Sequence, residues 1–320
     1  MSKSAIVWII VGASLVLLGA IIFGGVMMSI KWDFKKLSTV RYETNRYEIS
    51  ENYKNISIDT STADIVFLPS TDGVTAVVCY EQIKEKHAVS VKDNTVCIEI
   101  ANTKKWYEYV GVTFDTPKIT VYIPEGEYGA LRVKNQTGDL EIPDHFKFES
   151  LDVSGSTGNV NCFASVSDAV KIKVSTGHIQ VDGISAGSLD LAVSTGRVRA
   201  SSIECDGTVR ITVSTGKNFL TDVKCKSLYS SGSTGDVSLE RVIAEESFSV
   251  ERTTGDIELE GCDAAELWLK TSTGDVEGSL LSEKIFITNS KTGDIEVPKS
   301  TSGGRCEIST STGDIEIEIK

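Results

Sequence analysis

The side chains that most often perform acid–base or metal chemistry are few and widely spaced in this sequence. Only three histidines occur among the 320 residues, His87, His145 and His178, and none has the spacing of a metal motif such as His-Glu-x-x-His. We therefore interpret them as isolated surface histidines. The sequence predicts no catalytic residue, no metal centre built on histidine and no cofactor.

Three short segments imitate nucleophilic and phosphate-binding motifs without completing them. Ser154–Gly158 and Ser231–Gly235 lack the first Gly of the Gly-x-Ser-x-Gly turn, and Ser214–Lys217 lacks the upstream Gly of a phosphate loop. A carbohydrate-active β-helix enzyme would need an acid–base or metal cluster, usually on long insertions. Because the repeat spacing described below leaves no room for insertions, we predict a protein that is not an enzyme.

Charged residues that should face outward point most directly to a partner. A basic patch, a candidate site for anionic wall polymer or lipid, consists of Arg197, Arg199 and Lys217. An acidic strip, a candidate site for divalent ions or cationic peptides, consists of Asp256, Glu258, Asp275, Glu277, Asp294, Glu296, Asp314 and Glu316. The alternative interpretation is a solvated face that keeps the protein soluble.

The seven cysteines allow either thiols or disulfides. Cys205 and Cys225 occupy equivalent positions of adjacent repeats, and stacked positions about 4.8 Å apart are within disulfide range. Cys79–Cys97 is a second pair that the sequence leaves open. Because Ala stands at the equivalent position of other repeats, we favour buried thiols that replace a small apolar side chain.

A Thr-Gly dipeptide recurs ten times at intervals of 19 or 20 residues and organises most of the chain. A fixed period in this range is typical of a solenoid, in which each repeat forms one coil. Gly suits a sharp corner because it tolerates positive φ. The corner glycines are Gly138, Gly158, Gly177, Gly196, Gly216, Gly235, Gly255, Gly274, Gly293 and Gly313.

Apolar residues alternate on both sides of each corner glycine. They stand seven and five residues before it and two, four and seven residues after it, as with Phe286, Ile295 and Leu281 in the late repeats. This pattern predicts an all-β fold, a single-stranded right-handed parallel β-helix over residues 131–320, with coils stacked in sequence order. By parity, the Thr before each Gly should point inward and form a hydroxyl ladder.

Residues 45–130 are less regular and should form a β-rich N-terminal cap. They contain one degenerate coil in which Ala63 replaces Gly, and several segments that alternate like antiparallel strands. Asp93-Asn94 suits a tight hairpin turn. At the other end, residues 315–320 show no obvious cap, and their outward charges should discourage edge-to-edge pairing.

Residues 1–31 predict an N-terminal transmembrane anchor, followed by a juxtamembrane linker at 32–44. No charge occurs from Ser4 to Ile30, a run long enough to span a membrane, and no signal-peptidase motif follows it. A cleaved signal peptide is the alternative. The positive charges after the apolar span favour a cytoplasmic β-domain. However, a long domain that follows a short N-terminal tail is often translocated across the membrane. We expect a single-pass cell-membrane protein with an extracytoplasmic β-domain.

The segments "STADIVFLPS" and "KITVYIP" and the repeated "STGDI/V" resemble the bacterial putative-adhesin β-repeat family, domain of unknown function 4097, over residues 45–320. The resemblance implies a β-helical envelope protein without established enzymatic activity, some relatives being linked to envelope stress. The net charge of −13 argues against a nucleic-acid partner. We expect a membrane-anchored binding or display module whose partner is an envelope polymer, a cationic peptide or a protein. The alternative is a cytoplasm-facing scaffold or sensor partner.

Overall fold

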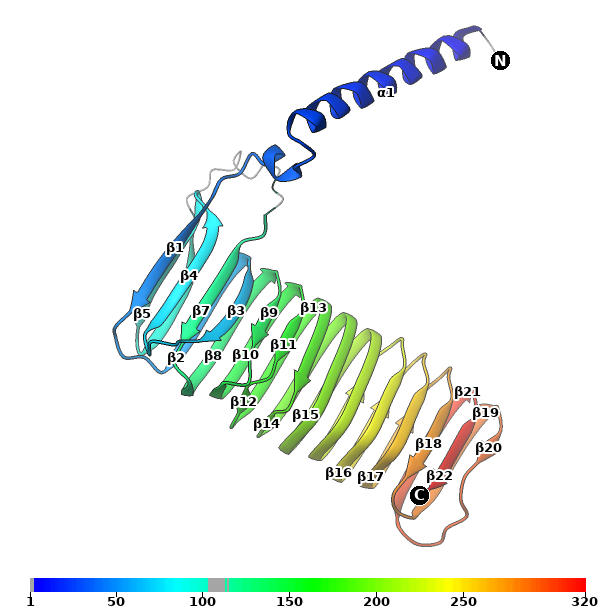
Figure 1. Ribbon diagram of the computed structural model, residues 1–320. Coiled ribbons are helices and arrows are strands. Elements are labelled where there is room, and N and C mark those ends of the chain that lie inside the picture. The colour runs from blue at the N-terminus through cyan, green and yellow to red at the C-terminus, as the bar shows by residue number, and fades with distance from the viewer. Residues whose placement is uncertain (1–2, 103–112, 114) are drawn as a thin grey trace.

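The computed structural model describes residues 3–102, 113 and 115–320 and consists of one apolar helix and a long stack of β-coils (Figure 1). Helix α1, Lys3–Ser29, projects from the end of the stack that holds the N-terminal strands. Its segment Ser4–Ser29 is long and apolar enough to cross a membrane, judged by length and composition alone. A short 3-10 helix, Phe34–Leu37, follows.

Seven strands form the described part of the N-terminal cap. They are β1 (Tyr42–Ile49), β2 (Asn55–Thr62), β3 (Asp64–Pro69), β4 (Thr75–Gln82), β5 (Glu85–Lys92), β6 (Thr95–Asn102) and β7 (Lys118–Ile123).

The repeat region supplies the remaining strands. They are β8 (Gly126–Thr137), β9 (Leu140–Ile142), β10 (Phe146–Thr157), β11 (Val160–Cys162), β12 (Ser165–Val166), β13 (Ala169–Asp182), β14 (Ser185–Ala186), β15 (Ser188–Ser231), β16 (Val237–Glu251), β17 (Ile257–Lys270), β18 (Val276–Leu280), β19 (Lys284–Thr292), β20 (Ile295–Glu296), β21 (Gly304–Thr312) and β22 (Ile315–Ile319).

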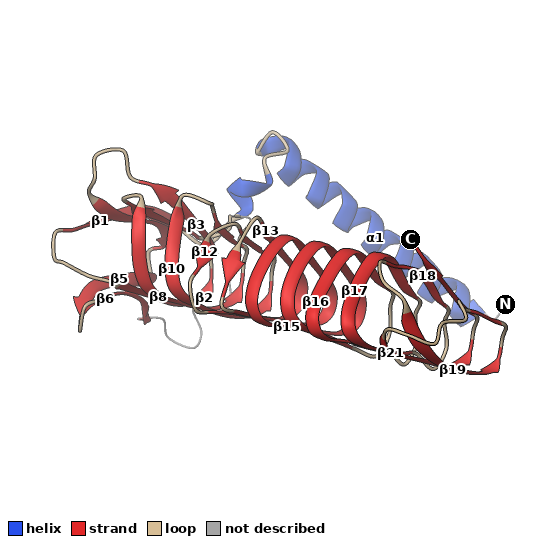
Figure 2. Ribbon diagram, turned by 90° about the horizontal axis from the view of Figure 1, so that it is seen from below, coloured by secondary structure: helices blue, strands red, loops and turns tan. Residues whose placement is uncertain are grey.

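The repeats stack as a parallel β-solenoid, which confirms the predicted fold class (Figure 2). Equivalent residues of neighbouring coils pair directly, as with Gly177 and Gly196. The corner glycine of each coil lies against the backbone of a neighbouring coil. A Cβ at Gly196 would come within 1.7 Å of the carbonyl oxygen of Gly177 in the preceding coil. The apolar positions around the corners form one continuous buried core.

The N-terminal cap is partly as predicted. β2 and β3 form the degenerate coil, and Ala63 lies against the Gly138 corner. The hairpin turn at Asp93-Asn94 is confirmed, because both residues have positive φ, 46° and 60°. The expected antiparallel strands are only half antiparallel. β6 pairs parallel with β2 and antiparallel with β5. β7 pairs parallel with β3 and antiparallel with β4.

The prediction of an inward Thr ladder is wrong. In all ten repeats the Thr of the Thr-Gly pair is exposed, and equivalent threonines such as Thr157 and Thr176 stack on the outer surface. The preceding residue also faces outward in most coils, so the alternation shifts by one residue at the corner. The last inward side chain before the glycine therefore stands three residues earlier, as with Val174 and Val193.

The last two coils do not stack in sequence order, contrary to our expectation. β21 and β22 pair with β17 and β18 on one side and with β19 and β20 on the other. The C-terminal coil is therefore inserted between its two predecessors, and the coil of β19 and β20 forms the end of the stack. Its predicted core residue Ile295 is 43% exposed.

One register shift also changes the predicted core. Leu281 is 49% exposed, whereas Leu280 is buried and pairs with Cys262. The pairing of β17 with β18 changes register between Leu259 and Cys262. The inward position on β18 therefore falls one residue earlier than the repeat numbering predicts.

A polar cluster interrupts the apolar interior at two positions where the pattern calls for hydrophobic residues. Asn218 and Ser230 are buried, and the Asn218 amide lies 3.0 Å from Ser230 Oγ. Arg252 Nη2 donates to Ser230 Oγ at 3.3 Å, and burial lowers the pKa of this guanidinium to about 10. Gly232 provides the room, since a Cβ there would meet Arg252 Nη1 at 2.7 Å.

Candidate cation-binding face

The glutamates of the predicted acidic strip form one column on the surface of four adjacent coils. Glu258 pairs with Glu277, Glu277 with Glu316, and Glu316 with Glu296 in directly opposed parallel register. All four side chains are exposed. Because the C-terminal coil is inserted, the spatial order of the column differs from its order in the sequence.

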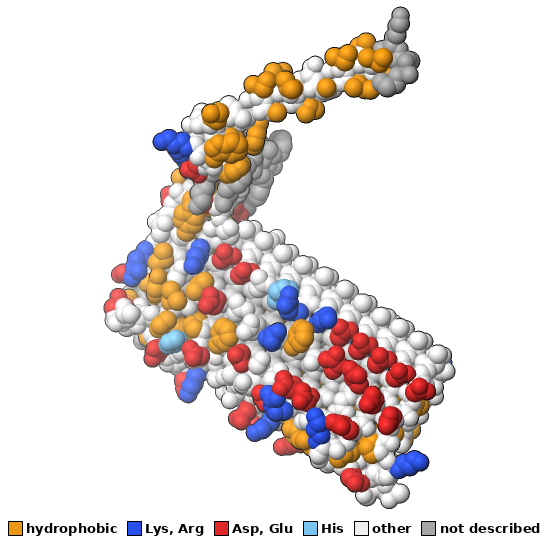
Figure 3. All heavy atoms as spheres, turned by 45° about the vertical axis from the view of Figure 1, so that its right-hand side comes forward, with side chains coloured by type: hydrophobic (Ala, Val, Ile, Leu, Met, Phe, Trp, Pro, Cys, Tyr) orange, Lys and Arg blue, Asp and Glu red, His pale blue; other side chains and the backbone are white. Residues whose placement is uncertain are grey.

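A shallow groove of about 640 Å³ lies along this column. Its walls include further acidic side chains, Glu240, Glu260 and Glu318, which stand five residues after their corner glycines. The same repeat numbering marks these positions, but Ser279 separates Glu260 from Glu318 in the stack, so they do not form a second continuous column. Figure 3 shows the acidic side chains gathered over the coils near the C-terminal end of the solenoid.

The aspartates of the strip have a structural role that the sequence analysis did not predict. The Asp275 backbone N–H donates to Asp256 Oδ1 at 2.9 Å, the Asp314 N–H to Asp275 Oδ1 at 2.7 Å, and the Asp294 N–H to Asp314 Oδ1 at 2.8 Å. The carboxylates of Asp256, Asp275 and Asp314 thus each satisfy a backbone donor of an adjacent coil at the corner. Asp236 extends this ladder through the Asp256 N–H at 3.3 Å.

The four column glutamates, in contrast, have no hydrogen bond or ion pair with any side chain in the described part of the chain. The cation on the groove wall is Lys320, whose Nζ lies 3.6 Å from a Glu318 carboxylate oxygen. Within residues 3–102, 113 and 115–320, no three carboxylates of this face bring their oxygens within 4.8 Å of one another. The face is therefore an extended acidic surface and not a preassembled chelating site for one ion.

The basic patch is brought together on coils adjacent to the acidic face. Arg197 and Arg199 are exposed on β15, and the Arg199 guanidinium lies 5.1 Å from the centre of the Phe219 ring. Lys217 Nζ forms an ion pair with Asp236 Oδ2 at 2.8 Å, which raises the lysine pKa. Lys217 thus marks the boundary between the basic patch and the acidic strip. Arg197 forms no ion pair or ring contact with any described residue.

The remaining chemistry-bearing residues fall in two groups. His145 and His178 are exposed, as predicted. The prediction is wrong for His87, which is 4% exposed and contacts Glu81 inside the cap. All seven cysteines lie in described segments and are unpaired. Cys205 and Cys225 are buried thiols and form no disulfide. Cys79 and Cys97 are also free thiols.

Comparison with known proteins gives one family match. A family model described as Toastrack DUF4097 matches residues 53–217 and 207–320. A search of the curated proteins finds no match.

Solved structures that are similar to the chain include two putative adhesins and a putative lipid binding protein. A putative adhesin from Bacteroides fragilis is 15% identical, with 87% of this chain and 97% of that chain covered and a TM-score of 0.30. A putative adhesin from Parabacteroides distasonis is 13% identical, with coverage of 87% and 98% and a TM-score of 0.40. A putative lipid binding protein from the same species is 16% identical, with coverage of 75% and 95% and a TM-score of 0.33.

Proposed function

The chain belongs to the Toastrack DUF4097 family, and from this premise we propose that it is a membrane-anchored, non-catalytic binding module of the cell envelope. The solenoid is a rigid display surface, and its acidic face is the binding site for an extended cationic ligand such as a basic peptide. The observation that carries this proposal is the column of Glu258, Glu277, Glu316 and Glu296, which form no hydrogen bond or ion pair with any described side chain.

The column is energetically unfavourable for the isolated protein. Like charges on directly opposed strand positions destabilise a sheet. A ligand with several positive charges would remove this repulsion across all four coils at once. An extended ligand fits better than a single divalent ion, because the carboxylates lie along a groove and do not converge on one point.

The test is binding of a fluorescent oligolysine peptide to the purified full-length chain in detergent at low and physiological salt. The variant E258Q/E277Q/E296Q/E316Q removes four charges and leaves the aspartate ladder intact. We expect its affinity to fall at least about tenfold at low salt, and less at physiological salt because exposed charges are screened.

A matched control separates the face from net charge. E51Q/E125Q/E245Q/E266Q removes the same number of exposed charges outside the groove. The control should keep nearly the wild-type affinity. Equal losses in the two variants, or no loss in the first, would refute the acidic face as the ligand site.

Membrane anchoring and orientation are part of the proposal. Support for the anchor comes from the apolar segment Ser4–Ser29, whose large apolar side chains from Ile6 to Phe23 are exposed. We propose that this helix stays attached and that the β-domain lies outside the cytoplasm. The alternative, a cytoplasm-facing scaffold, is favoured by one observation: all seven cysteines are free thiols, as is usual in a reducing compartment.

Protease treatment of intact cells that carry a C-terminal epitope distinguishes the two orientations. An external β-domain should lose the epitope to added protease while a cytoplasmic marker protein survives. Retention of the epitope until the cells are lysed would establish the cytoplasm-facing alternative.

A further inference from the structure

A buried group of polar side chains lies in the N-terminal cap, far along the stack from the acidic face. The strands β4 and β5 form a hairpin but pair with each other only at Gln82 and Glu85, so they diverge into the two walls of the cap. Cys79 and Glu81 stand on the inward face of β4, and His87 stands on β5 opposite them. All three are buried, with exposures of 0%, 1% and 4%.

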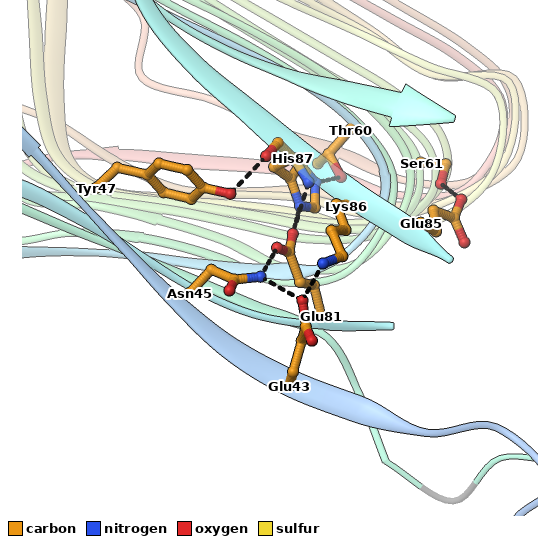
Figure 4. A network of polar contacts seen from close by, with 9 residues as sticks. All are labelled: Glu43, Asn45, Tyr47, Thr60, Ser61, Glu81, Glu85, Lys86 and His87. Carbon is orange, nitrogen blue, oxygen red and sulfur yellow. Dashed lines mark hydrogen bonds and ion pairs between the residues drawn. The ribbon is translucent and has the colours of Figure 1, made fainter. Parts of the chain in front are cut away.

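The side chains of Glu81 and His87 are held in one orientation by neighbouring strands (Figure 4). His87 Nδ1 lies 2.7 Å from Glu81 Oε2, and the His87 backbone N–H donates to the same oxygen at 2.6 Å. Asn45 Nδ2 donates to Glu81 Oε1 at 2.7 Å. His87 Nε2 lies 2.9 Å from Thr60 Oγ1 on β2. Both functional groups are therefore fixed by a second layer of contacts.

Cys79 completes the group. Its Sγ, a carboxylate oxygen of Glu81 and an imidazole nitrogen of His87 all lie within 4.8 Å of one another. In a tetrahedral zinc site the ligand atoms are roughly 3.3 to 3.6 Å apart, as follows from metal–ligand distances of about 2.0 to 2.3 Å. Small side-chain movements would therefore bring the three atoms to coordination distance. Thiolate, imidazole and carboxylate are the ligand types that zinc takes in proteins.

The charges of the group also suit a divalent cation. A buried carboxylate is costly unless a positive charge accompanies it. A Zn²⁺ ion with one thiolate and one carboxylate makes a neutral unit, while a neutral imidazole adds no charge. Binding releases the thiol proton of Cys79, and Thr60 accepts the N–H of His87 Nε2, as the second layer of a zinc site typically does.

We propose that Cys79, Glu81 and His87 bind one Zn²⁺ ion that joins the two walls of the N-terminal cap. Nδ1 is the ligating nitrogen of His87, because it is the one that faces Glu81. The second carboxylate oxygen of Glu81 or a water molecule fills the fourth position. This site is independent of the acidic face and of the ligand proposed for it.

The experiment uses the purified full-length chain in detergent, incubated with Zn²⁺ or Co²⁺ and then desalted. We expect about one metal ion per chain by elemental mass spectrometry, and a thiolate-to-cobalt charge-transfer band in the Co²⁺ sample. C79S and H87Q should each lower the metal content at least about tenfold and abolish the band. Removal of Zn²⁺ with a chelator should lower the thermal stability of the wild-type chain.

Two control variants keep the outcome unambiguous. C162S removes an equally buried cysteine of the solenoid, and C97S removes the other cap cysteine, so both should retain metal and band. The wild-type measurement decides the matter even if C79S fails to fold. Metal content well below one ion per chain, or Co²⁺ bound without a thiolate band, would show that the group is only a hydrogen-bonded network.

Discussion

At the corners of the coils, single residues determine whether neighbouring coils can stack. Gly196 has a φ of 147°, and a Cβ added to it would lie 1.7 Å from the Gly177 carbonyl oxygen. We predict that Gly196→Ala destabilises the protein by more than about 3 kcal/mol, because the new methyl group must displace backbone. The measurement is denaturant unfolding followed by circular dichroism.

Gly183 provides the matched control for this prediction. Its φ is also positive, 67°, but no atom lies within 4 Å of a Cβ added there. Ser202, Asp222 and Arg241 occupy the same position of the following coils with φ of 52° to 54°. Gly183→Ala should therefore cost only about 1 to 2 kcal/mol, the cost of placing an L residue in the left-handed conformation. Similar losses at both sites would contradict the close-packing argument.

Thiol reactivity is a second prediction at the residue scale. Burial raises the pKa of the Cys162 and Cys306 thiols to about 12, so at neutral pH almost none of either is the reactive thiolate. Cys97 is the cysteine that is partly exposed. We expect a maleimide to modify Cys97 alone in the native protein and seven thiols after denaturation without reductant. Fewer than seven by mass spectrometry would reveal a disulfide.

Between strands, the aspartate ladder should contribute hydrogen bonds rather than charge. Asp275 Oδ1 accepts the Asp314 N–H, and Asn can do the same without a negative charge. We predict that Asp275→Ala lowers stability by about 1 to 2 kcal/mol because a corner N–H loses its acceptor. Asp275→Asn should be neutral or slightly stabilising, because it also relieves repulsion within the ladder. Equal destabilisation by Ala and Asn in thermal unfolding would contradict this role.

The elements differ in how far the sequence could predict them. Residues such as Val198 and Ile257 repeat with a strict period, so the coils and their core followed from alternation alone. The outward direction of the corner threonines did not follow from alternation. The inward–outward alternation shifts by one residue at each corner, and only the backbone geometry shows at which residue. The Glu81–His87 contact also escaped, since it joins two strands of a hairpin that diverge, and neither spacing nor period marks it. The acidic strip was predictable in composition but not in its spatial order.

At the scale of the whole molecule, the inserted C-terminal coil changes which end of the solenoid is exposed. The last residues of a linear solenoid fray first, because the terminal coil has a neighbour on one side only. Here β21 and β22 have neighbours on both sides, whereas β19 has one described partner strand. The charges of Ile315–Lys320 therefore do not protect the edge, and Ile285, Ile287 and Ile295 are exposed at the end of the stack.

Hydrogen exchange measured by mass spectrometry tests this order. We predict that amides of β21 and β22 exchange more slowly than those of β19 and β20, although they lie closer to the C-terminus. Peptides from β17, which lies inside the stack in either arrangement, serve as the protected reference. Amide exchange that is as fast in residues 304–319 as in 284–296, or faster, would mean that the coils stack in sequence order and that the C-terminal segment forms the open end.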